Sequence, residues 1–256
     1  MMPGMSKIFF ASAVVTLLLL SACVTESQNK ALGETDLKRA AELNAQLGID
    51  HLRSGRLELA QEKLTKAVGQ DANNADAQSA LGILYLRTGE NDKAGRHLRK
   101  ALSLKPDDPA LANSYGVYLC DSGQEKESIQ YFTEAARNPR YSTRASAWVN
   151  AGNCALKIPD IEQAEGFYRQ ALNMDSRRNE ALAQLAQISF QRGEYLKARA
   201  FIQRYERNTT VLSAQLLLLA ARNELQLKDR TAARAYAQRL RTEYPEASSD
   251  LEEIGL

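Results

Sequence analysis

Small residues recur along this chain with a period of 34 residues, and large apolar residues occupy many of the positions between them. The glycines of the first three copies are Gly48, Gly82 and Gly116 and, seven positions later in each copy, Gly55, Gly89 and Gly123. A further small residue, Ala60 in the first copy, follows five positions after the second glycine. Apolar residues at helical spacing, interrupted by glycine, predict two helices joined by a turn. A period of this length predicts a solenoid of such hairpins.

The small positions also predict how each hairpin packs. Gly48 and Ala60 fall where the two helices cross, and small side chains there let the helix axes approach to roughly 8–10 Å. Gly55 ends the first helix, because a left-handed C-cap is least costly without a Cβ. Pro109 opens the first helix of the third copy, since proline is tolerated at a helix start but not inside one. The large apolar residues expected around the small ones include Leu81, Tyr85, Leu98, Trp148, Tyr168 and Leu185.

The period, the small positions and the turn resemble the tetratricopeptide repeat, between about Ala40 and Pro245. The resemblance implies an all-α fold, a right-handed superhelix of about six helix-turn-helix repeats. We expect repeats near 41–74, 75–108, 109–144, 145–178, 179–213 and 214–247, a repeat domain over 40–245 and an acidic C-terminal tail over 246–256. The third and fourth repeats are 36 residues apart instead of 34, which predicts an inserted turn within Ala136–Ser142.

The N-terminus belongs to a different class of sequence. Lys7 precedes the apolar run Ile8–Leu20, which is too short to span a bilayer as a helix and is typical of a signal peptide over residues 1–22. The segment Leu20–Cys23 resembles the bacterial lipobox, which implies a diacylglycerol and an N-acyl chain such as palmitate on Cys23. Because Val24 and not aspartate follows, the sorting pattern of such lipoproteins favours the periplasmic face of the outer membrane. An ordinary signal peptide is the alternative.

Two further expectations concern this end of the chain. Residues 23–39 are polar and lack apolar periodicity, which predicts a lipidated N-terminus and a flexible tether. Translation can start at Met1, Met2 or Met5, and the sequence does not decide between them.

Composition argues against several classes of function. The 33 basic and 31 acidic residues nearly cancel and form no basic block, so we expect no nucleic-acid partner. The two histidines, His51 and His97, have no metal-ligand spacing. No nucleophile and base motif and no phosphate-binding glycine loop is present. We therefore expect no enzyme, no catalytic residue, no metal, no small-molecule substrate and no cofactor beyond the lipid on Cys23.

Tetratricopeptide superhelices bind partners in the groove that the first helix of each repeat lines, usually through repeat positions 2, 5, 9, 12 and 13. In repeats one and two these positions form an aliphatic strip edged by arginines. Such a strip suits an extended or helical peptide with apolar anchors and acidic groups. Packing between neighbouring helices is the alternative for each residue. The predicted partner-binding residues are Ile49, Leu52, Arg53, Ile83, Leu86, Arg87, Asn113, Val117, Asp121 and Asn153.

The remaining cysteines, Cys120 and Cys154, occupy the first helices of adjacent repeats. Neighbouring first helices pack side by side and the periplasm permits oxidation, which favours a disulfide between them. Two separately buried thiols are the alternative.

Several motifs together resemble a more specific family. The segments Asn113–Gly116, Asn138–Tyr141 and Asn150–Gly152, with the lipobox, the tether and six repeats, resemble the PilF/PilW lipoproteins of type IV pilus biogenesis. The resemblance implies an outer-membrane pilotin that binds secretin subunits of the type IV pilus and promotes their outer-membrane localisation and multimerisation. The repeats alone leave open a lipoprotein adaptor for outer-membrane barrel assembly or for cell-wall enzymes.

Overall fold

The structure is a computed structural model that describes residues 33–158, 160–247, 251 and 255. These residues form twelve α-helices and one short 3-10 helix, η1 (Pro245–Ala247), and include no strand. The helices are α2 (Glu34–Arg53), α3 (Leu57–Gln70), α4 (Ala75–Arg87), α5 (Asn91–Leu104), α6 (Pro109–Asp121), α7 (Glu125–Arg137), α8 (Arg144–Ala155), α9 (Ile161–Met174), α10 (Asn179–Gln191), α11 (Tyr195–Asn208), α12 (Ala214–Gln226) and α13 (Arg230–Glu243). The predicted all-α class is confirmed. None of the helices described is long and apolar enough to cross a membrane.

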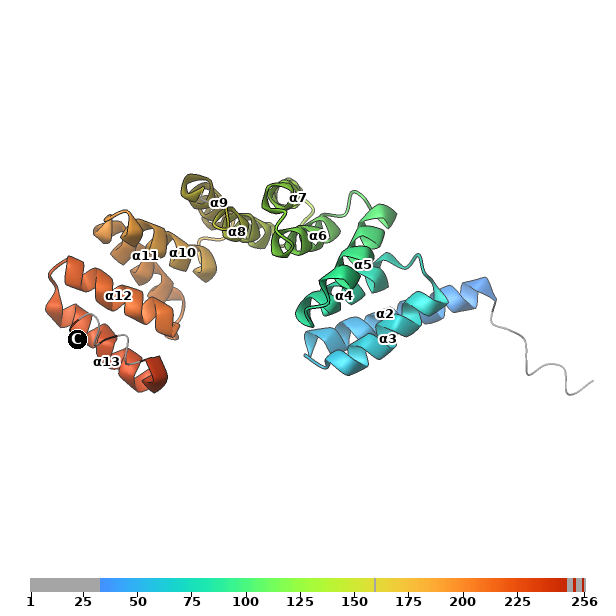
Figure 1. Cartoon of the computed structure of the whole chain (residues 1–256), viewed down its shortest axis with the longest axis horizontal. Coiled ribbons are helices and arrows are strands. Elements are labelled where there is room, and N and C mark those ends of the chain that lie inside the picture. The colour runs from blue at the N-terminus through green and yellow to red at the C-terminus, as the bar shows by residue number, and fades with distance from the viewer. Residues whose placement is uncertain (1–32, 159, 248–250, 252–254, 256) are drawn as a thin grey trace, which may run out of the picture.

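Consecutive helices form six hairpins, from α2 with α3 to α12 with α13, and the hairpins follow one another along an arc (Figure 1). Each second helix also packs against the first helix of the next hairpin, as α3 does against α4. The hydrophobic core is therefore continuous along the arc, with each hairpin burying its apolar face against its neighbours.

Glycine lies where the helices of a hairpin cross. A Cβ added to Gly82 of α4 would lie 2.4 Å from Cγ of Leu98 on α5. Gly48, Gly116 and Gly152 face the bulky residues Leu64, Phe132 and Tyr168 in the same way. The large residue of the second helix thus occupies the space that the missing side chain leaves, and this contact sets the close approach of the two helices.

The second glycine of the repeat ends the first helix with a left-handed residue. Gly55, Gly89, Gly123 and Gly193 have φ between 71° and 78°. In the last hairpin this conformation falls on Lys228, at φ 62°. Glycine adopts this conformation without steric penalty, whereas the Cβ of lysine disfavours it.

The first helix begins earlier than the sequence predicted. We expected a tether over residues 23–39, but α2 already starts at Glu34, so residues 34–39 of that tether are helical. Glu34 and Asp36 lie in the first turn, where carboxylates interact favourably with the helix N-terminus. Lys38 forms an ion pair with Glu34 at 2.7 Å across one turn. The apolar periodicity that we used to find helices misses this polar turn. The predicted signal peptide, Cys23 and residues 24–32 of the predicted tether lie outside the described residues.

The extra residues between the third and fourth hairpins connect α7 to α8. Arg144 Nε donates to the carbonyl of Ala136 at 2.8 Å across this connection, and Tyr141 packs against the central core cluster. At the other end of the chain, the side chain of Leu251, in the predicted acidic tail, is fully buried against the last hairpins.

Candidate partner-binding surface

A groove of about 410 Å³ lies across the first helices of repeats one to three. Its apolar lining includes Ile49 from α2 and Ile83 and Ala80 from α4. The two isoleucines are half-buried and occupy the same repeat position, so together they form an accessible aliphatic strip. An apolar strip that remains accessible in a folded protein is typical of an interaction surface.

The two edges of this groove carry opposite charges. Arg53 and Arg87, at the C-terminal ends of α2 and α4, form one edge, and Asp76 and Asp108, at the N-terminal ends of α4 and α6, form the other. Both carboxylates already have partners: Asp76 accepts from Lys105 at 2.9 Å, and Asp108 caps α6.

The two arginines of the other edge keep more of their hydrogen-bond donors available than the carboxylates keep acceptors. Arg87 Nη1 donates to the carbonyl of Leu52 at 2.8 Å, which leaves its other donors available. The side chain of Arg53 is 74% exposed, and its ion pair among the described residues is one of 3.6 Å with Asp50. The groove therefore presents two guanidinium groups with available donors beside its apolar strip.

The structure places the predicted groove residues in three different environments. Ile49, Leu52, Arg53, Ile83 and Arg87 line the groove of repeats one to three, although Leu52 is only 5% exposed and acts mainly in packing. Leu86 and Val117 are half-buried and do not line this groove; Leu86 packs against the core cluster beneath it, and Val117 against the central core cluster. Asn113, Asp121 and Asn153 bond to other side chains: Asn113 accepts from Asn150 at 3.1 Å, Asp121 from Lys157 at 3.0 Å, and Asn153 from Tyr168 at 2.8 Å.

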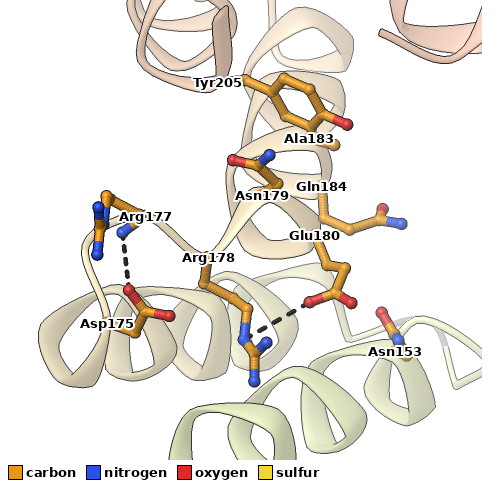
Figure 2. A pocket seen from close by; sticks show the side chains of 9 residues that line it. All are labelled: Asn153, Asp175, Arg177, Arg178, Asn179, Glu180, Ala183, Gln184 and Tyr205. Atoms are coloured by element: carbon orange, nitrogen blue, oxygen red, sulfur yellow. Dashed lines mark hydrogen bonds and ion pairs between the residues drawn. The ribbon is translucent and has the colours of Figure 1, made fainter. Parts of the chain in front are cut away.

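A second groove, of about 610 Å³, lies at repeats four and five (Figure 2). Its lining is mostly polar and includes Asn153 from α8 and Gln184 from α10. Arg178 lies 3.6 Å from Glu180 and also donates to Ser146. Two of the charges of this groove, Arg178 and Glu180, are thus paired with each other, and the carboxylate of Asp175 accepts from the backbone N–H of Arg177 at 3.1 Å.

Several lining residues of both grooves escaped the sequence analysis. Arg178 lies in the loop before α10 and Tyr205 on α11, a second helix, so neither belongs to the repeat positions used for prediction. Asp76 occupies repeat position 2, but the predicted site was built on the aliphatic strip and its arginines and did not include this carboxylate. Within the described residues, no group of three or more His, Cys, Asp or Glu side chains is placed to hold a metal ion.

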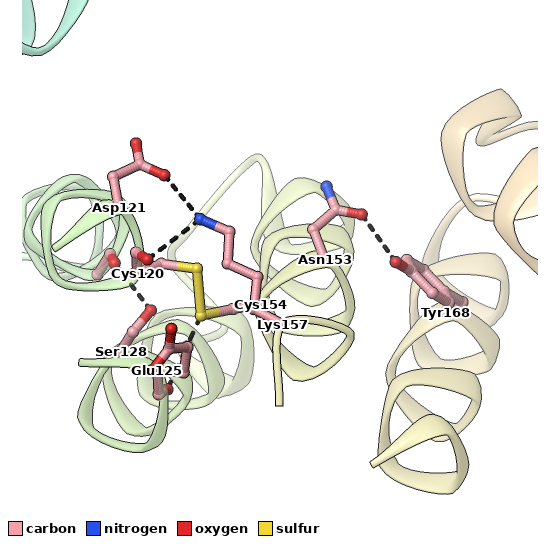
Figure 3. Close-up of a disulfide and its surroundings, with 9 residues drawn as sticks. Cys120, Asp121, Glu125, Ser128, Asn153, Cys154, Lys157 and Tyr168 are labelled. Carbon is pink, nitrogen blue, oxygen red and sulfur yellow. Dashed lines mark hydrogen bonds and ion pairs between the residues drawn. A yellow bond between two sulfur atoms is a disulfide. The ribbon is translucent and has the colours of Figure 1, made fainter. Parts of the chain in front are cut away.

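Cys120 and Cys154 form a disulfide between α6 and α8, with a Cα–Cα distance of 5.9 Å (Figure 3). Lys157 reinforces this junction, because its ammonium group donates to the carbonyl of Cys120 at 3.1 Å as well as to Asp121. The bridge joins the repeats on either side of the inserted turn, and Cys154 is next in the sequence to Asn153 of the second groove.

Comparison with known proteins agrees with this architecture. The tetratricopeptide-repeat family matches residues 51–116 and 160–212. The type IV pilus assembly protein PilF of Pseudomonas aeruginosa is 29% identical over 238 residues, covering 91% of this chain and 94% of PilF. The chain is a PilF/PilW-like tetratricopeptide-repeat protein. An uncharacterised Haemophilus influenzae protein is 26% identical over 169 residues, covering 66% of this chain and 92% of that protein.

Solved structures extend the PilF/PilW similarity to three dimensions. The Pseudomonas aeruginosa PilF structure matches with a TM-score of 0.77 and 25% identity, over 85% of this chain and 99% of PilF. The structure of PilW, described as a widely conserved type IV pilus biogenesis factor, matches with a TM-score of 0.76 and 28% identity, over 84% of this chain and 98% of PilW. The matches cover nearly all of both proteins, so the similarity concerns the whole repeat array and not one hairpin.

Proposed function

We propose that this PilF/PilW-like chain serves type IV pilus biogenesis as a lipid-anchored pilotin. It binds secretin subunits in the groove of repeats one to three and promotes their localisation and multimerisation at the outer membrane. The similarity to PilF over 91% of the chain carries this proposal. The lipobox-like segment ending at Cys23 supports anchoring, with a diacylglycerol and an N-acyl chain on that cysteine.

The chemistry of the first groove supports a protein client. A segment with aliphatic side chains would bury them against Ile49 and Ile83, and acidic side chains beside them would meet Arg53 and Arg87. Apolar anchors supply most of the affinity in such interfaces, and charge complementarity supplies orientation and association rate. The proposal requires binding alone, in keeping with the expectation from the sequence that the chain is not an enzyme.

The client site is tested by an Ile49→Asp, Ile83→Asp double variant of the full chain. We expect it to lose secretin binding and to leave the secretin monomeric, because two carboxylates would be buried against the client's apolar anchors. The matched control is Leu59→Asp with Leu196→Asp, which changes exposed leucines on α3 and α11, outside both grooves. Circular dichroism establishes that both variants fold. Normal secretin multimers with the groove variant would contradict this placement of the site.

The anchor and the client class are tested separately. A Cys23→Ala variant is expected to incorporate no radioactive palmitate and to leave the outer-membrane fraction, while its purified chain still binds secretin.

Deletion of the protein distinguishes the clients. Loss of twitching motility with monomeric secretin supports the pilus, whereas a general envelope defect with intact secretin multimers supports barrel or cell-wall assembly instead.

A further inference from the structure

Three exposed arginines form a stripe along α13, the second helix of the last hairpin. Arg230, Arg234 and Arg241 are four and seven positions apart, so they lie within about 40° of one another around the helix and span about 16 Å along it. Tyr236, which donates to Glu206 of α11, projects from the other side of α13. The stripe therefore lies on the outer end of the repeat array, where no further hairpin follows within the described residues.

The arginines of the stripe differ from other arginines nearby in having no ion pair among the described residues. Arg199 of α11 pairs with the buried carboxylate of Glu224. Arg239 of α13 pairs with Glu206 at 3.3 Å and with Glu243 at 2.9 Å. Those arginines hold neighbouring helices together, whereas the three of the stripe carry charge that the fold does not use.

Two features of the stripe oppose the stability of its helix. The second helices of the first four hairpins, α3, α5, α7 and α9, carry a carboxylate in the first turn, where it interacts favourably with the helix N-terminus. α13 has no acid in its first turn and begins with Arg230, whose charge is unfavourable there. Arg230 and Arg234 also repel each other across one turn, whereas the same spacing on α9 holds an ion pair of 2.6 Å between Glu165 and Arg169.

A third basic residue at this end of the hairpin also occupies a costly position. Lys228 is exposed and has φ 62°, the left-handed conformation that glycine adopts in four other hairpins. Arg241 extends the stripe to the last turn of α13, where a cation is favourable. Positions that break a local rule of stability are expected at functional sites. The costs at Lys228, Arg230 and Arg234 all retain positive charge, which indicates that this charge acts on something outside the fold.

The surroundings of the stripe suit a flat anionic surface and not a protein segment. α13, which the structure describes in full, exposes no large apolar side chain that could anchor a protein partner. The exposed side chains beside the stripe are small or polar, such as Ala235 and Gln238. None of the three arginines lines either of the grooves described above. A guanidinium group binds phosphate through two parallel hydrogen bonds, so phospholipid headgroups have the chemistry that fits.

The shape of the array brings this stripe within reach of a membrane. The first and last hairpins lie on the same side of the middle hairpins, so both ends of the arc point the same way (Figure 1). At the other end of the arc, α2 begins at Glu34, eleven positions after the predicted lipid attachment at Cys23. A bilayer that holds Cys23 therefore lies near both ends of the arc.

We propose that Arg230, Arg234 and Arg241 bind the phosphate groups of anionic phospholipids. The array then contacts the membrane at two points, through the acyl chains on Cys23 at one end and through the arginine stripe at the other. Basic side chains close to an anionic bilayer are attracted to it, and salt screens the attraction. The proposal rests on the proposed function for the anchor at Cys23. It goes further because the second contact fixes the orientation of the array and turns its concave face towards the bilayer.

The test measures how close α13 lies to the membrane when the lipidated full chain is reconstituted in vesicles. A dye is attached through a Gln238→Cys substitution, because Gln238 is exposed beside the stripe and Cys120 and Cys154 are bridged. Energy transfer to an acceptor on lipid headgroups is compared between vesicles of phosphatidylcholine and vesicles of phosphatidylcholine and phosphatidylglycerol in equal parts. We expect more transfer in the anionic vesicles, and we expect high salt to remove the increase.

Two triple variants show whether the stripe causes this increase. The stripe variant is Arg230→Gln, Arg234→Gln, Arg241→Gln, and it should show the same transfer in both kinds of vesicle. The matched control is Lys66→Gln, Arg96→Gln, Lys100→Gln, which removes as many exposed charges from α3 and α5 and should keep the increase. Circular dichroism establishes that both fold. The unfolding temperature of the stripe variant should not fall, because the substitutions remove the repulsion between Arg230 and Arg234.

Equal transfer in neutral and anionic vesicles with the wild-type stripe would overturn the proposal, and so would an increase that survives in the stripe variant. If the increase survives and the stripe variant instead loses secretin binding, the arginines bind an acidic protein segment and the proposal is wrong. Flotation with neutral vesicles separates these results from failure of the proposed anchor. A chain that does not float with neutral vesicles contradicts acylation of Cys23. Flotation of that chain and of its stripe variant with anionic vesicles then decides the role of the arginines.

Discussion

The first and last three repeats share one fold but present different chemistry on their first helices. At repeat position 9 the first half carries Ile49, Ile83 and Val117, whereas the second half carries Asn153, Gln187 and Arg222. The change coincides with the inserted turn and the disulfide between α6 and α8. In the first half these side chains are half-buried and pack against core clusters, whereas the second half has polar side chains at the same position. Under the proposed function, the two halves would therefore present different chemistry to a client protein.

The two halves also differ where their helices cross. Repeats one to four have glycine at position 8 against Leu, Phe or Tyr, whereas repeats five and six have Ala186 and Ala221 against Ile202 and Ala237. In the sixth repeat the larger first-helix residue Ala221 faces a smaller residue, Ala237, whereas in the fifth Ala186 faces Ile202, which has the volume of a leucine. The crossing of the second half therefore tolerates a methyl group on the first helix.

Removing the disulfide should have the largest effect on stability, because it joins the two halves. In the chain-entropy model, a bridge between residues 34 positions apart stabilises by about 3–4 kcal/mol. We expect the Cys120→Ala, Cys154→Ala variant to lose about this much and to unfold in two separate transitions during urea denaturation followed by circular dichroism. Reductant should destabilise wild type and leave the variant unaffected. A single transition at the wild-type midpoint would contradict the idea that the bridge couples the halves.

Adding a methyl group at a helix crossing of the first half and removing one at a crossing of the second half should both destabilise the protein. Gly82→Ala adds a Cβ 2.4 Å from Leu98 Cγ and 3.2 Å from the Leu98 backbone nitrogen. Overpacking of this kind costs about 1–3 kcal/mol, and the better helix propensity of alanine offsets up to about 1 kcal/mol of it. Ala186→Gly removes a methyl group and should cost about 1 kcal/mol. Urea denaturation of both variants measures these changes.

Gly69 on α3 provides the control for this pair. A Cβ at Gly69 would contact nothing within 4 Å. Gly69→Ala should therefore show the propensity gain alone, about 1 kcal/mol of stabilisation. If Gly82→Ala stabilised the protein as much as Gly69→Ala does, the close approach of α4 and α5 would not be a tight constraint.

These contacts show how far sequence can predict this molecule. The hairpins, their crossings and the left-handed turns depend on local spacing, and Gly82 against Leu98 illustrates that such spacing predicts the fold well. The partner-binding site is harder to predict from the sequence, because a residue that the repeat pattern assigns to the groove can instead be buried in packing. Leu52 at position 12 is nearly buried, while Ile49 at position 9 stays accessible. Tyr205 lines the second groove from α11 and Arg178 from the loop before α10, and the prediction considered only positions on the first helix of each repeat.

The turns within the hairpins differ between the halves in one residue type, and we expect the effect on stability to be small. Four hairpins turn on a left-handed glycine, but the sixth uses Lys228 at φ 62°. Lys228→Gly should stabilise the protein by about 1 kcal/mol, because a left-handed conformation costs a residue with a Cβ about that much. Gly193→Lys, the reverse change in the fifth hairpin, should destabilise it by a similar amount. Thermal unfolding measures both, and a loss of stability in Lys228→Gly would contradict this account.

The smallest expected effect is a pH dependence confined to the first half, where both histidines of the chain lie. Burial, together with Arg96 and Lys93, lowers the pKa of His97, which stacks on Tyr85 and hydrogen-bonds to Gln78. The unfolded state therefore binds the proton more readily than the folded state. The resulting stability is fully present above the unfolded pKa of about 6.5 and is lost as pH falls through the folded value. A His97→Gln variant should lose this component of the pH dependence between pH 7 and 5, and urea midpoints across that range measure the change. An unchanged pH profile in the variant would show that His97 titrates alike in both states.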